Sequence, residues 1–482
     1  MCVLKNIEPL RVMYYFEEIS KIPRGSGNID EISEYLVDFA KAHSLRYIQD
    51  EIKNVIIFKD ASEGYENRSP VIIQGHMDMV AVKTSNCNKD MKTEGLDLFI
   101  DGDLVGAKDT TLGADNGVAV AYALALLESS EYKHPKLEVI ITVEEEVGMD
   151  GAKYIDVSML EGRKFINIDS GEEGYLLTSC AGGGRFLAEL DLAKEMVNGS
   201  MMEITLDGLQ GGHSGVEIHT GRANACYEII RLVRSLADKL DVKLASACGG
   251  GVDNVIPSLA KVTIIIDEKD EAKLNHIIEC HKKMLQNEYI GKEEGININI
   301  RNLGVVRAEA ISDESFNKMS TLILALPNGV QSMSGTISGL VETSLNLGVM
   351  NISADRMNIL YAVRSSVESK KEELVSKMNL LAKAFNAKVV TKSFYPAWQY
   401  REKSQLREEF IRAYKELFGK EPVIEAVHAG LECGFFAGKI ENLDCISFGP
   451  DLYEIHSVNE RMSISSLQRM WKYLLRVLET AE

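Results

Sequence analysis

The chain has 482 residues, of which 45% are hydrophobic and 26% are charged, a globular composition that excludes disorder along the whole length. Its 72 acidic residues outnumber its 53 basic residues, giving a formal net charge of −19. This excess of acid disfavours binding to nucleic acid or to an anionic membrane, because both require a cationic surface. At roughly 150 residues per domain, the length predicts two or three domains.

The eight cysteines are scattered and form no CxxC pair, which argues against a zinc finger or a thioredoxin-like site. Sparse cysteine in a chain of this length is typical of a reducing compartment. The N-terminal segment lacks the basic and apolar regions of a signal peptide, and no run of 18 apolar residues occurs. We therefore expect a cytoplasmic protein without a membrane span.

The first part of the chain, residues 1–184, alternates helix and strand patterns. Helical spacing of apolar residues, in places after an acidic N-terminal residue, is found over 9–22, 30–43 and 115–128. Short runs rich in β-branched residues predict buried strands at 55–58, 71–73, 137–143 and 165–168. Short apolar strands separated by helices predict a mainly parallel sheet with helices on both faces.

A different pattern covers residues 185–395. Strand–helix–strand–strand segments, glycine clusters and long amphipathic helices occur there, and the segment that begins at Asn254 is echoed by the one that begins at Thr343. After residue 396 the first pattern returns and continues to the end. The expected architecture is an α/β catalytic domain built from residues 1–184 and 396–482. An α+β lid domain of two similar halves, residues 185–395, is inserted between them.

Acidic and imidazole side chains follow the predicted strands of the α/β domain. His76 and Asp78 lie just past an apolar strand, where open α/β sheets bind ligands. A spacing of two in extended chain points both side chains the same way, so the carboxylate can orient the imidazole as a metal ligand. The alternative is a histidine that only ends a strand.

The same two interpretations apply to the other acids. Asp115 is either a helix N-cap or a carboxylate that bridges two cations, with Gly113 and Gly117 allowing a close approach of backbone and metal. The three glutamates 144–146 are either a solvated charge run or a metal ligand beside a base that faces the reacting water. Asp169 and His456 each follow a further predicted strand.

Together these residues are two histidines and several carboxylates at one predicted sheet edge. Two zinc ions that share a carboxylate need about this set of nitrogen and oxygen ligands. So many like charges would repel one another strongly without cations. No comparable cluster of thiols competes with them, so the set predicts a site for two divalent ions.

The lid domain contributes polar groups of another kind. His213 lies in a glycine-flanked turn and Asn254 follows a run of glycines; an incidental turn histidine is the alternative for the first. Arg364 ends a strand, where it could pair with a substrate carboxylate through two hydrogen bonds or form an ordinary surface ion pair. The segment around Gly430 would offer backbone donors near the metals.

Seven motifs occur in a characteristic order: GHMDMV, TTLGADNG, TVEEEVGMDGA, INIDS, GGHSGVEIHTGRANA, AVHAGLECG and IHSVNE. With them the chain closely resembles the aminoacyl-histidine dipeptidases (Xaa-His dipeptidases, or peptidase D). These are co-catalytic zinc peptidases related to carboxypeptidases and aminoacylases. The resemblance extends from about residue 10 to residue 475.

The resemblance implies a role for each matching residue. Asp115 bridges two zinc ions and is followed by a cis peptide bond to Asn116. The remaining metal ligands are His76 and Asp169 for one ion and Glu146 and His456 for the other. Asp78 orients His76, and Glu145 is the general base. The implied substrate contacts are His213, Asn254, Arg364 and Gly430. Mn²⁺ or Co²⁺ could replace Zn²⁺ at such an oxygen-rich site.

The implied activity is metal-dependent hydrolysis of dipeptides, preferentially Xaa-His dipeptides of the carnosine type. An N-acyl amino-acid deacylase or a tripeptidase would use the same metals with a different pocket. A binding protein without metals is disfavoured, because every ligand and the base are present. The partners expected are a dipeptide substrate and a second copy in a homodimer, since related lids often pair subunits. The alternative is a single chain whose duplicated lid supplies the whole site. Neither nucleic acid nor membrane is expected.

Overall fold

The computed structural model describes residues 3–481, which form two compact units. Unit 1 comprises Met1–Ser179, Tyr400–Ala426 and Leu431–Glu482. Unit 2 comprises Cys180–Gln399 together with the short segment Val427–Gly430. Each unit has its own hydrophobic core, so the fold of each is described separately.

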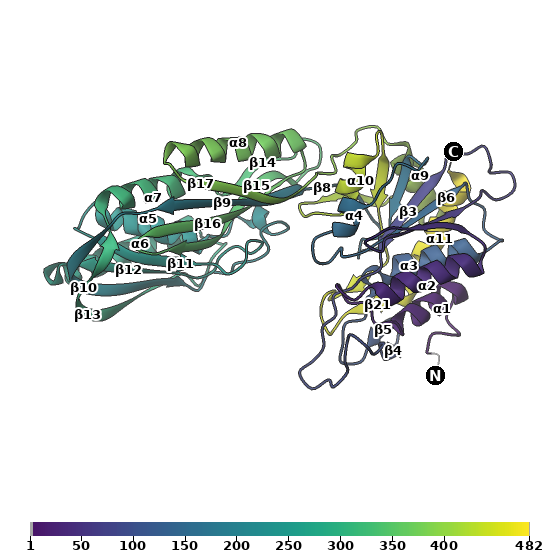
Figure 1. Ribbon diagram of the computed structural model, residues 1–482, viewed down its shortest axis with the longest axis horizontal. Helices are drawn as coiled ribbons and strands as arrows, with labels where there is room; N and C mark the ends of the chain where they lie inside the picture. Colours follow the sequence, from purple (N-terminus) through teal and green to yellow (C-terminus); the bar gives the residue numbers. More distant parts are fainter. Residues whose placement is uncertain (1–2, 482) are drawn as a thin grey trace. The chain divides into compact units, whose positions relative to one another are not determined.

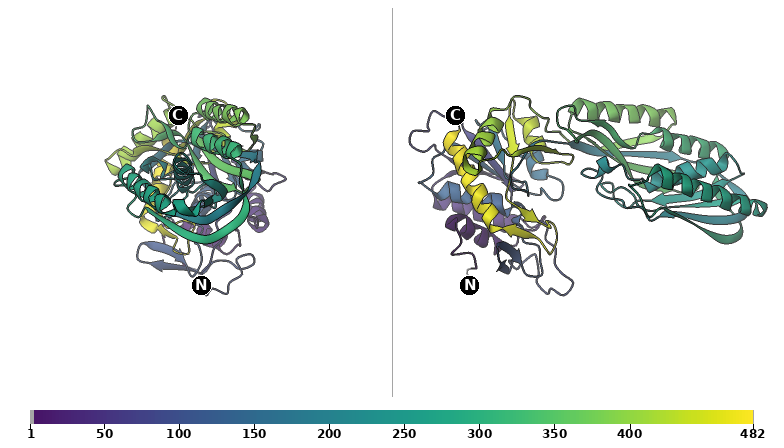
Figure 2. Two further views of the ribbon diagram at one scale, coloured as in Figure 1. Left: turned by 90° about the vertical axis from the view of Figure 1, so that its left-hand side faces the viewer. Right: turned by 180° about the vertical axis from the view of Figure 1, so that it is seen from behind.

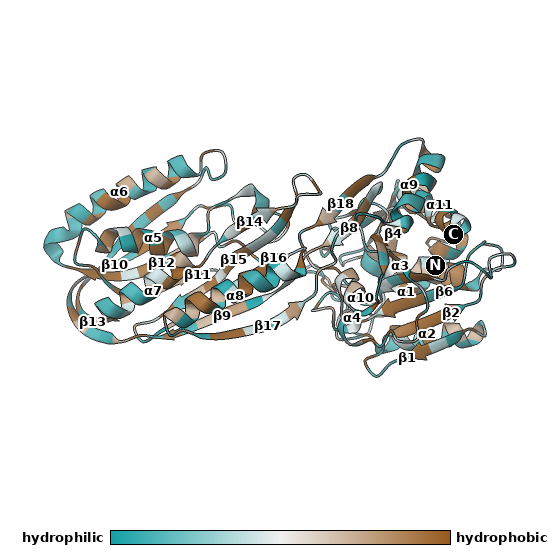
Figure 3. Ribbon diagram, turned by 90° about the horizontal axis from the view of Figure 1, so that it is seen from above, coloured by the Kyte–Doolittle hydropathy of each residue, from teal (hydrophilic) through white to brown (hydrophobic). Residues whose placement is uncertain are grey.

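The main sheet of unit 1 has eight strands in the order β1-β2-β6-β3-β7-β19-β8-β18. Strands β3, β6 and β8 of this sheet are labelled in Figure 1. Its central strands β6, β3, β7 and β19 run parallel, and antiparallel strands lie toward both edges. Every residue of β3, β6 and β7 is buried, as expected when both faces of a sheet are covered. Figure 3 shows the apolar character of strands such as β2 and β6. The strands are β1 Arg46–Gln49, β2 Val55–Lys59, β3 Val71–His76, β6 Leu137–Thr142, β7 Lys164–Asn167, β8 Tyr175–Cys180, β18 Val423–Val427 and β19 Asp444–Ser447.

The helices of this unit are α1 Leu10–Ser20, α2 Asp30–Ala42, α3 Ala114–Glu128, α4 Asp150–Tyr154, α9 Gln405–Phe418, α10 Cys433–Lys439 and α11 Ile464–Thr480. α3 is buried almost all round, and its alanines and valines allow it to lie close to β3. The C-terminal helix α11 contacts α3 through Tyr122 and Trp471, whose ring centroids are 5.0 Å apart. It contacts α9 through the Tyr473 hydroxyl, which donates to the Phe410 carbonyl at 2.8 Å.

A second, antiparallel sheet in unit 1 was not expected from the sequence. Its strands are β4 Leu98–Asp101, β5 Leu104–Ala107, β20 Leu452–Tyr453 and β21 Arg461–Ser463, in the order β20-β21-β5-β4. Each of its strands is only two to four residues long, which is too short for an alternating pattern to be recognised in the sequence. The loop between β20 and β21 contains His456, so this sheet anchors both ends of that loop.

The sheet of unit 2 has nine strands and is antiparallel throughout its paired strands. Its strand order is β13-β10-β12-β11-β15-β16-β9-β17, with β14 beside β15. Figures 2 and 3 show its helices gathered on one face of the sheet. The strands are β9 Gly182–Asp191, β10 Lys194–Asp207, β11 Lys243–Gly249, β12 Ala260–Ile266, β13 Asn297–Ile311, β14 Gly329–Met333, β15 Val341–Ile352, β16 Arg356–Ser365 and β17 Lys388–Tyr395. The helices are α5 Ala225–Ala237, α6 Glu271–Glu288, α7 Asp313–Ala325 and α8 Glu368–Ala384.

Unit 2 consists of two similar halves, as the sequence predicted. One half is β10–α5–β11–β12–α6–β13, and the other is β9–α7–β15–β16–α8–β17. The strand orders β13-β10-β12-β11 and β17-β9-β16-β15 are the same, and the two halves meet where β11 pairs with β15. The first half is contiguous and is inserted between β9 and α7 of the second, so one half is nested within the other.

Within residues 3–481, no helix combines the length and the apolar character needed to cross a membrane.

Candidate active site

Three parallel strands of unit 1 end at the same edge of the sheet and carry acidic or imidazole groups there. His76 is the last residue of β3, the acids 144–146 follow β6, and Asp169 follows β7. This edge is where the carboxyl ends of parallel strands place ligands in open α/β sheets. The strand pattern therefore accounts for how residues far apart in sequence meet.

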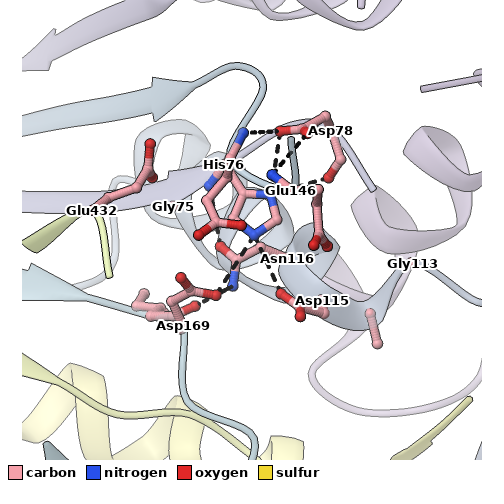
Figure 4. A network of polar contacts seen from close by, with 12 residues as sticks. Gly75, His76, Asp78, Gly113, Asp115, Asn116, Glu146, Asp169 and Glu432 are labelled. Atoms are coloured by element: carbon pink, nitrogen blue, oxygen red, sulfur yellow. Dashed lines mark hydrogen bonds and ion pairs between the residues drawn. The ribbon is translucent and has the colours of Figure 1, made fainter. Parts of the chain in front are cut away.

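The buried His76 imidazole is surrounded by carboxylates (Figure 4). Its Nδ1 lies 3.4 Å from Asp78 Oδ1 and 3.1 Å from the Asp78 carbonyl oxygen. Its Nε2 lies 3.2 Å from Asp115 Oδ1 and 3.6 Å from Asp169 Oδ1. Asp78 thus holds one side of the ring, and the other nitrogen faces two acids.

Asp115 lies between two imidazoles. Its Oδ1 faces His76, and its Oδ2 lies 3.2 Å from Nε2 of His456. The same His456 nitrogen is 3.1 Å from Glu146 Oε2. The cis bond between Asp115 and Asn116 that was expected is present. One carboxylate therefore connects the pair His76 and Asp169 with the pair His456 and Glu146.

Asp78 also holds the glutamate segment in place. Its Oδ1 accepts a hydrogen bond from the Glu145 backbone N–H at 3.1 Å, and its Oδ2 accepts one from the Glu146 N–H at 3.4 Å. The Ser26 hydroxyl donates to Oδ2 at 2.8 Å. Asp78 consequently fixes Glu145 and Glu146 relative to His76.

The electrostatics of this cluster are those of a cation site. Burial raises the pKa of Glu145 well above its ordinary value, and the neighbouring acids Asp169, Glu432 and Asp115 add to the rise. Hydrogen bonds to Asp115 and Glu146 raise the pKa of His456 to about 10. Glu146 Oε1 is buried without a hydrogen-bond partner. His76, Asp115 and Glu146 offer ligand atoms within 4.8 Å of one another, so this set of nitrogen and oxygen donors fits divalent cations.

Comparison with known proteins agrees with this geometry. The model of Peptidase family M20/M25/M40 matches residues 72–480. The chain belongs to this peptidase family. It is 36% identical to the cytosol non-specific dipeptidase of Escherichia coli (strain K12) over 481 residues, which cover 99% of each protein.

Solved structures support the same assignment. An aminoacylhistidine dipeptidase from Vibrio alginolyticus superimposes with a TM-score of 0.92 at 34% identity, covering 99% of this chain and 98% of that one. The aminopeptidase PepT from Bacillus cereus matches with a TM-score of 0.57 at 16% identity, covering 98% of each chain, and shares the fold. As a member of the M20/M25/M40 family, the chain is a peptidase and therefore a hydrolase.

The lid residues of this M20 peptidase lie in unit 2. His213 and Asn254 lie close together, because the Ser214 N–H donates to the Asn254 carbonyl at 2.8 Å and His213 pairs with Val255 in an isolated β-bridge. His213 Nδ1 accepts hydrogen bonds from the backbone N–H groups of Gly215 at 3.2 Å and Val216 at 3.1 Å. Burial and the nearby Arg364 lower the pKa of His213. Because Nδ1 accepts these two hydrogen bonds, the proton of the neutral ring lies on Nε2.

Arg364 is 9% exposed, so it is not a surface residue. Its Nη1 donates to the Tyr395 hydroxyl at 3.2 Å, and its Nε has no hydrogen-bond partner. Among residues 3–481, no carboxylate forms an ion pair with it. Gly430 belongs to the same unit through the segment Val427–Gly430, in which His428 Nε2 lies 2.7 Å from the Ser344 hydroxyl.

Several residues that support the site were missed by the sequence analysis. The Asn116 amide donates to the Ile168 carbonyl at 2.6 Å and to Asp169 Oδ1 at 3.0 Å, and it accepts from the His76 N–H at 3.2 Å. The buried Glu432 accepts from Thr142 Oγ1 at 2.7 Å and from the Gln74 amide, and burial raises its pKa to about 7. Glu432 lies in the AVHAGLECG motif, but the sequence of an acid-rich chain does not separate a buried acid from a surface one.

Two glycines beside Asp115 have a packing role that was not expected from the sequence. Gly113 and Gly117 were expected to let backbone and metal approach closely. A Cβ atom at either position would instead lie 2.6 Å from Nη2 of Arg24, which is fully buried beneath the Asp115 loop. Their missing side chains therefore make room for a guanidinium group, which no pattern in the sequence had indicated.

Proposed function

We propose that this M20 peptidase hydrolyses dipeptides, with Xaa-His dipeptides among its preferred substrates, using two divalent metal ions. The observation that supports this most strongly is the Asp115 carboxylate, which has one oxygen facing His76 and the other facing His456. The names of its full-length relatives, a non-specific dipeptidase and an aminoacylhistidine dipeptidase, agree with this activity.

The residues that would hold the metals are those of the cluster. His76, Asp169 and one oxygen of Asp115 would hold one ion, and His456, Glu146 and the other oxygen would hold the second. When bound, zinc ions supply positive charge that polarises a carbonyl group and lowers the pKa of water from 15.7 toward about 7. Mn²⁺ or Co²⁺ would suit the same oxygen-rich set.

Glu145 is the proposed general base. Its backbone is fixed by Asp78, and its pKa is raised by burial, so it can both accept a proton and return it. It takes the proton of the attacking water and later gives it to the amine that leaves the broken peptide bond. Asp78 positions both Glu145 and His76 for this reaction.

His213 is the proposed hydrogen-bond donor to the substrate carbonyl. The two backbone N–H groups that donate to its Nδ1 leave the proton on Nε2, where it can donate to an oxygen that becomes negative during the reaction. One preorganised donor of this kind typically lowers a barrier by roughly 3–4 kcal/mol. Asn254 and Gly430 are proposed as further substrate contacts.

Arg364 is proposed to bind the carboxylate of the dipeptide, because its buried guanidinium has no acidic partner among the described residues. Replacing Arg364 by Met should raise KM for a dipeptide by about 10–100-fold, the loss of a charge-assisted hydrogen-bond pair of roughly 1.5–3 kcal/mol. Steady-state kinetics with a dipeptide and with its C-terminal amide would measure this. The wild type should prefer the free carboxylate, and the variant should not.

Arg356 offers a matched control on the same strand. It is exposed and forms an ion pair with Asp191 at the other end of β16. Arg356→Met should keep the wild-type preference for the free carboxylate. An Arg364→Met variant that keeps that preference would exclude Arg364 from carboxylate binding.

A substrate panel tests the function as a whole. The purified chain should contain about two equivalents of metal and should hydrolyse β-Ala-His and Gly-His faster than N-acetyl amino acids or tripeptides. Removing the metal with a chelator should abolish turnover, and adding Zn²⁺, Mn²⁺ or Co²⁺ should restore it. Faster cleavage of N-acetyl amino acids or of tripeptides would identify a deacylase or a tripeptidase instead. Turnover that persists without metal would contradict the proposal.

The sequence predicted a cytoplasmic protein that forms a homodimer, and both stay proposals. The name of the Escherichia coli relative places that protein in the cytosol, and we propose the same compartment for this chain. A homodimer stays a prediction.

A further inference from the structure

The loop that carries Asp115 is wrapped around a buried carboxylate. Glu460 is 2% exposed and follows His456 by four residues. Its Oε2 accepts hydrogen bonds from the backbone N–H groups of Leu112 at 2.8 Å and Gly113 at 2.9 Å. Its Oε1 accepts from the N–H groups of Ala114 at 2.8 Å and Asp115 at 3.3 Å. One side chain thus satisfies four consecutive donors.

A buried guanidinium holds the same loop from another direction. Arg24 Nη2 donates to the Gly113 carbonyl. Its Nη1 donates to the carbonyl of Met77 at 2.9 Å and to that of Asp78 at 3.3 Å. Arg24 therefore joins the Asp115 loop to the chain directly after His76.

These two ionic side chains connect the three segments that carry the histidines and the bridging acid. Arg24 connects residues 77–78 with residue 113, and Glu460 connects residues 112–115 with the segment after His456. The hydrogen bonds that Arg24 and Glu460 form through their side chains go to backbone groups of residues 77–78 and 112–115. Their effect on chemistry would come through the spacing of His76, Asp115 and His456.

We propose that Glu460 and Arg24 are positioning residues that hold Asp115 between the two metal ions. This inference rests on the proposed dimetal function. Glu460 sets the position of Asp115 relative to His456, and Arg24 sets it relative to His76. Groups that orient metal ligands typically change metal affinity by about 10–100-fold when they are lost. Loss of either residue should therefore lower the affinity for metal. A buried residue far from the metal-binding edge should lower only the stability of the fold when it is lost.

The test compares Glu460→Gln with a matched variant, Glu138→Gln. Glu138 is also fully buried and also accepts backbone hydrogen bonds, from Glu161 and Gly162. It lies on β6 four residues before Thr142, the partner of His76, and so roughly 13 Å from the metal-binding edge. Both substitutions keep the shape of the side chain, remove its charge and place an amide group against N–H donors.

Zn²⁺ affinity of the metal-free chain would be measured by competition with a chromophoric chelator, and Tm of the metal-free chain would be measured alongside. Glu460→Gln should lower the affinity for the more weakly bound Zn²⁺ by about 10–100-fold. It should also change the visible spectrum of the Co²⁺-loaded protein. Glu138→Gln should lower Tm by a similar amount and bind both ions as the wild type does.

Arg24→Lys provides a second variant, because lysine keeps the charge but cannot reach three carbonyl groups with a rigid fork. It should show the same loss of Zn²⁺ affinity. Wild-type affinities in Glu460→Gln, or an equal loss in Glu138→Gln, would overturn the inference. A wild-type chain that binds no Zn²⁺ in the same titration would instead overturn the proposed function.

Discussion

Replacing Glu145 by Gln should lower kcat by about 10³–10⁴-fold while both metal ions stay bound. A positioned acid or base contributes up to roughly 10⁴-fold to such a reaction, and glutamine cannot accept the proton of water. Metal binding should persist, because Asp78 holds residue 145 through its backbone N–H, which the substitution leaves in place. Steady-state kinetics and metal analysis of the same preparation would measure both quantities.

Glu144 is the control for this experiment, since it belongs to the same run of acids. Its carboxylate accepts hydrogen bonds from the Gly27 backbone N–H at 2.8 and 3.1 Å and faces no metal-binding residue in any contact described here. Glu144→Gln should keep turnover near the wild-type value. More than a tenth of wild-type turnover in Glu145→Gln would remove Glu145 from its role as the base.

Replacing Asp115 by Ala should weaken the binding of both metal ions by at least about 100-fold, and turnover should fall below detection. Within residues 3–481, Asp115 is the one residue whose two carboxylate oxygens face the two histidines, at 3.2 Å in each case. Without it, each ion would lose a ligand, and the remaining carboxylates would lose the cation that offsets their repulsion. Zn²⁺ titration of the metal-free variant would measure both affinities.

His456→Ala is the control, because His456 is proposed to bind only one of the two metal ions, whereas Asp115 is proposed to bind both. Its imidazole contacts Asp115 and Glu146 and has no described contact with His76 or Asp169. This variant should lose one ion and keep the other with near-normal affinity. If Asp115→Ala also lost a single ion, Asp115 would serve one metal and the bridging arrangement would be wrong.

Much of the site could be predicted because the central strands of the sheet are parallel. Apolar runs located β3, β6 and β7, and the carboxyl ends of parallel strands share an edge, so His76, the glutamates 144–146 and Asp169 were expected to meet. The resemblance then singled out Glu146 as the metal ligand among the three glutamates. His456 follows a less regular path. Its nearest strands β20 and β21 are too short to give a periodic signal, and His456 was expected at this edge because it follows the predicted strand that is β19 in the structure and because it lies in the terminal motif.

The supporting residues could not be predicted for a different reason. Arg24 and Glu460 form hydrogen bonds with backbone groups. Every residue type carries the same backbone groups, so no residue pattern in the sequence indicates such partners. The chain has 72 acidic residues, and nothing in the sequence distinguishes the buried Glu460 from an exposed glutamate. The glycines at 113 and 117 were visible, but Arg24, whose side chain fills the space beside them, is 89 residues before Gly113 in the sequence and still farther from Gly117.

The nested lid has a topological consequence. Lys194 and Ile311 face each other across β10 and β13, and the Ser312 N–H donates to the Ala193 carbonyl at 2.8 Å. The inserted half, β10 to β13, therefore begins and ends at neighbouring positions in the other half, so a tight turn could replace it. A chain shortened in this way would lack β11, so the edge of β15 that pairs with β11 would be exposed. An exposed strand edge can pair with the same edge of a second molecule. The full chain covers this edge of β15 with its own β11, whereas the shortened chain could cover it only by pairing with a second molecule.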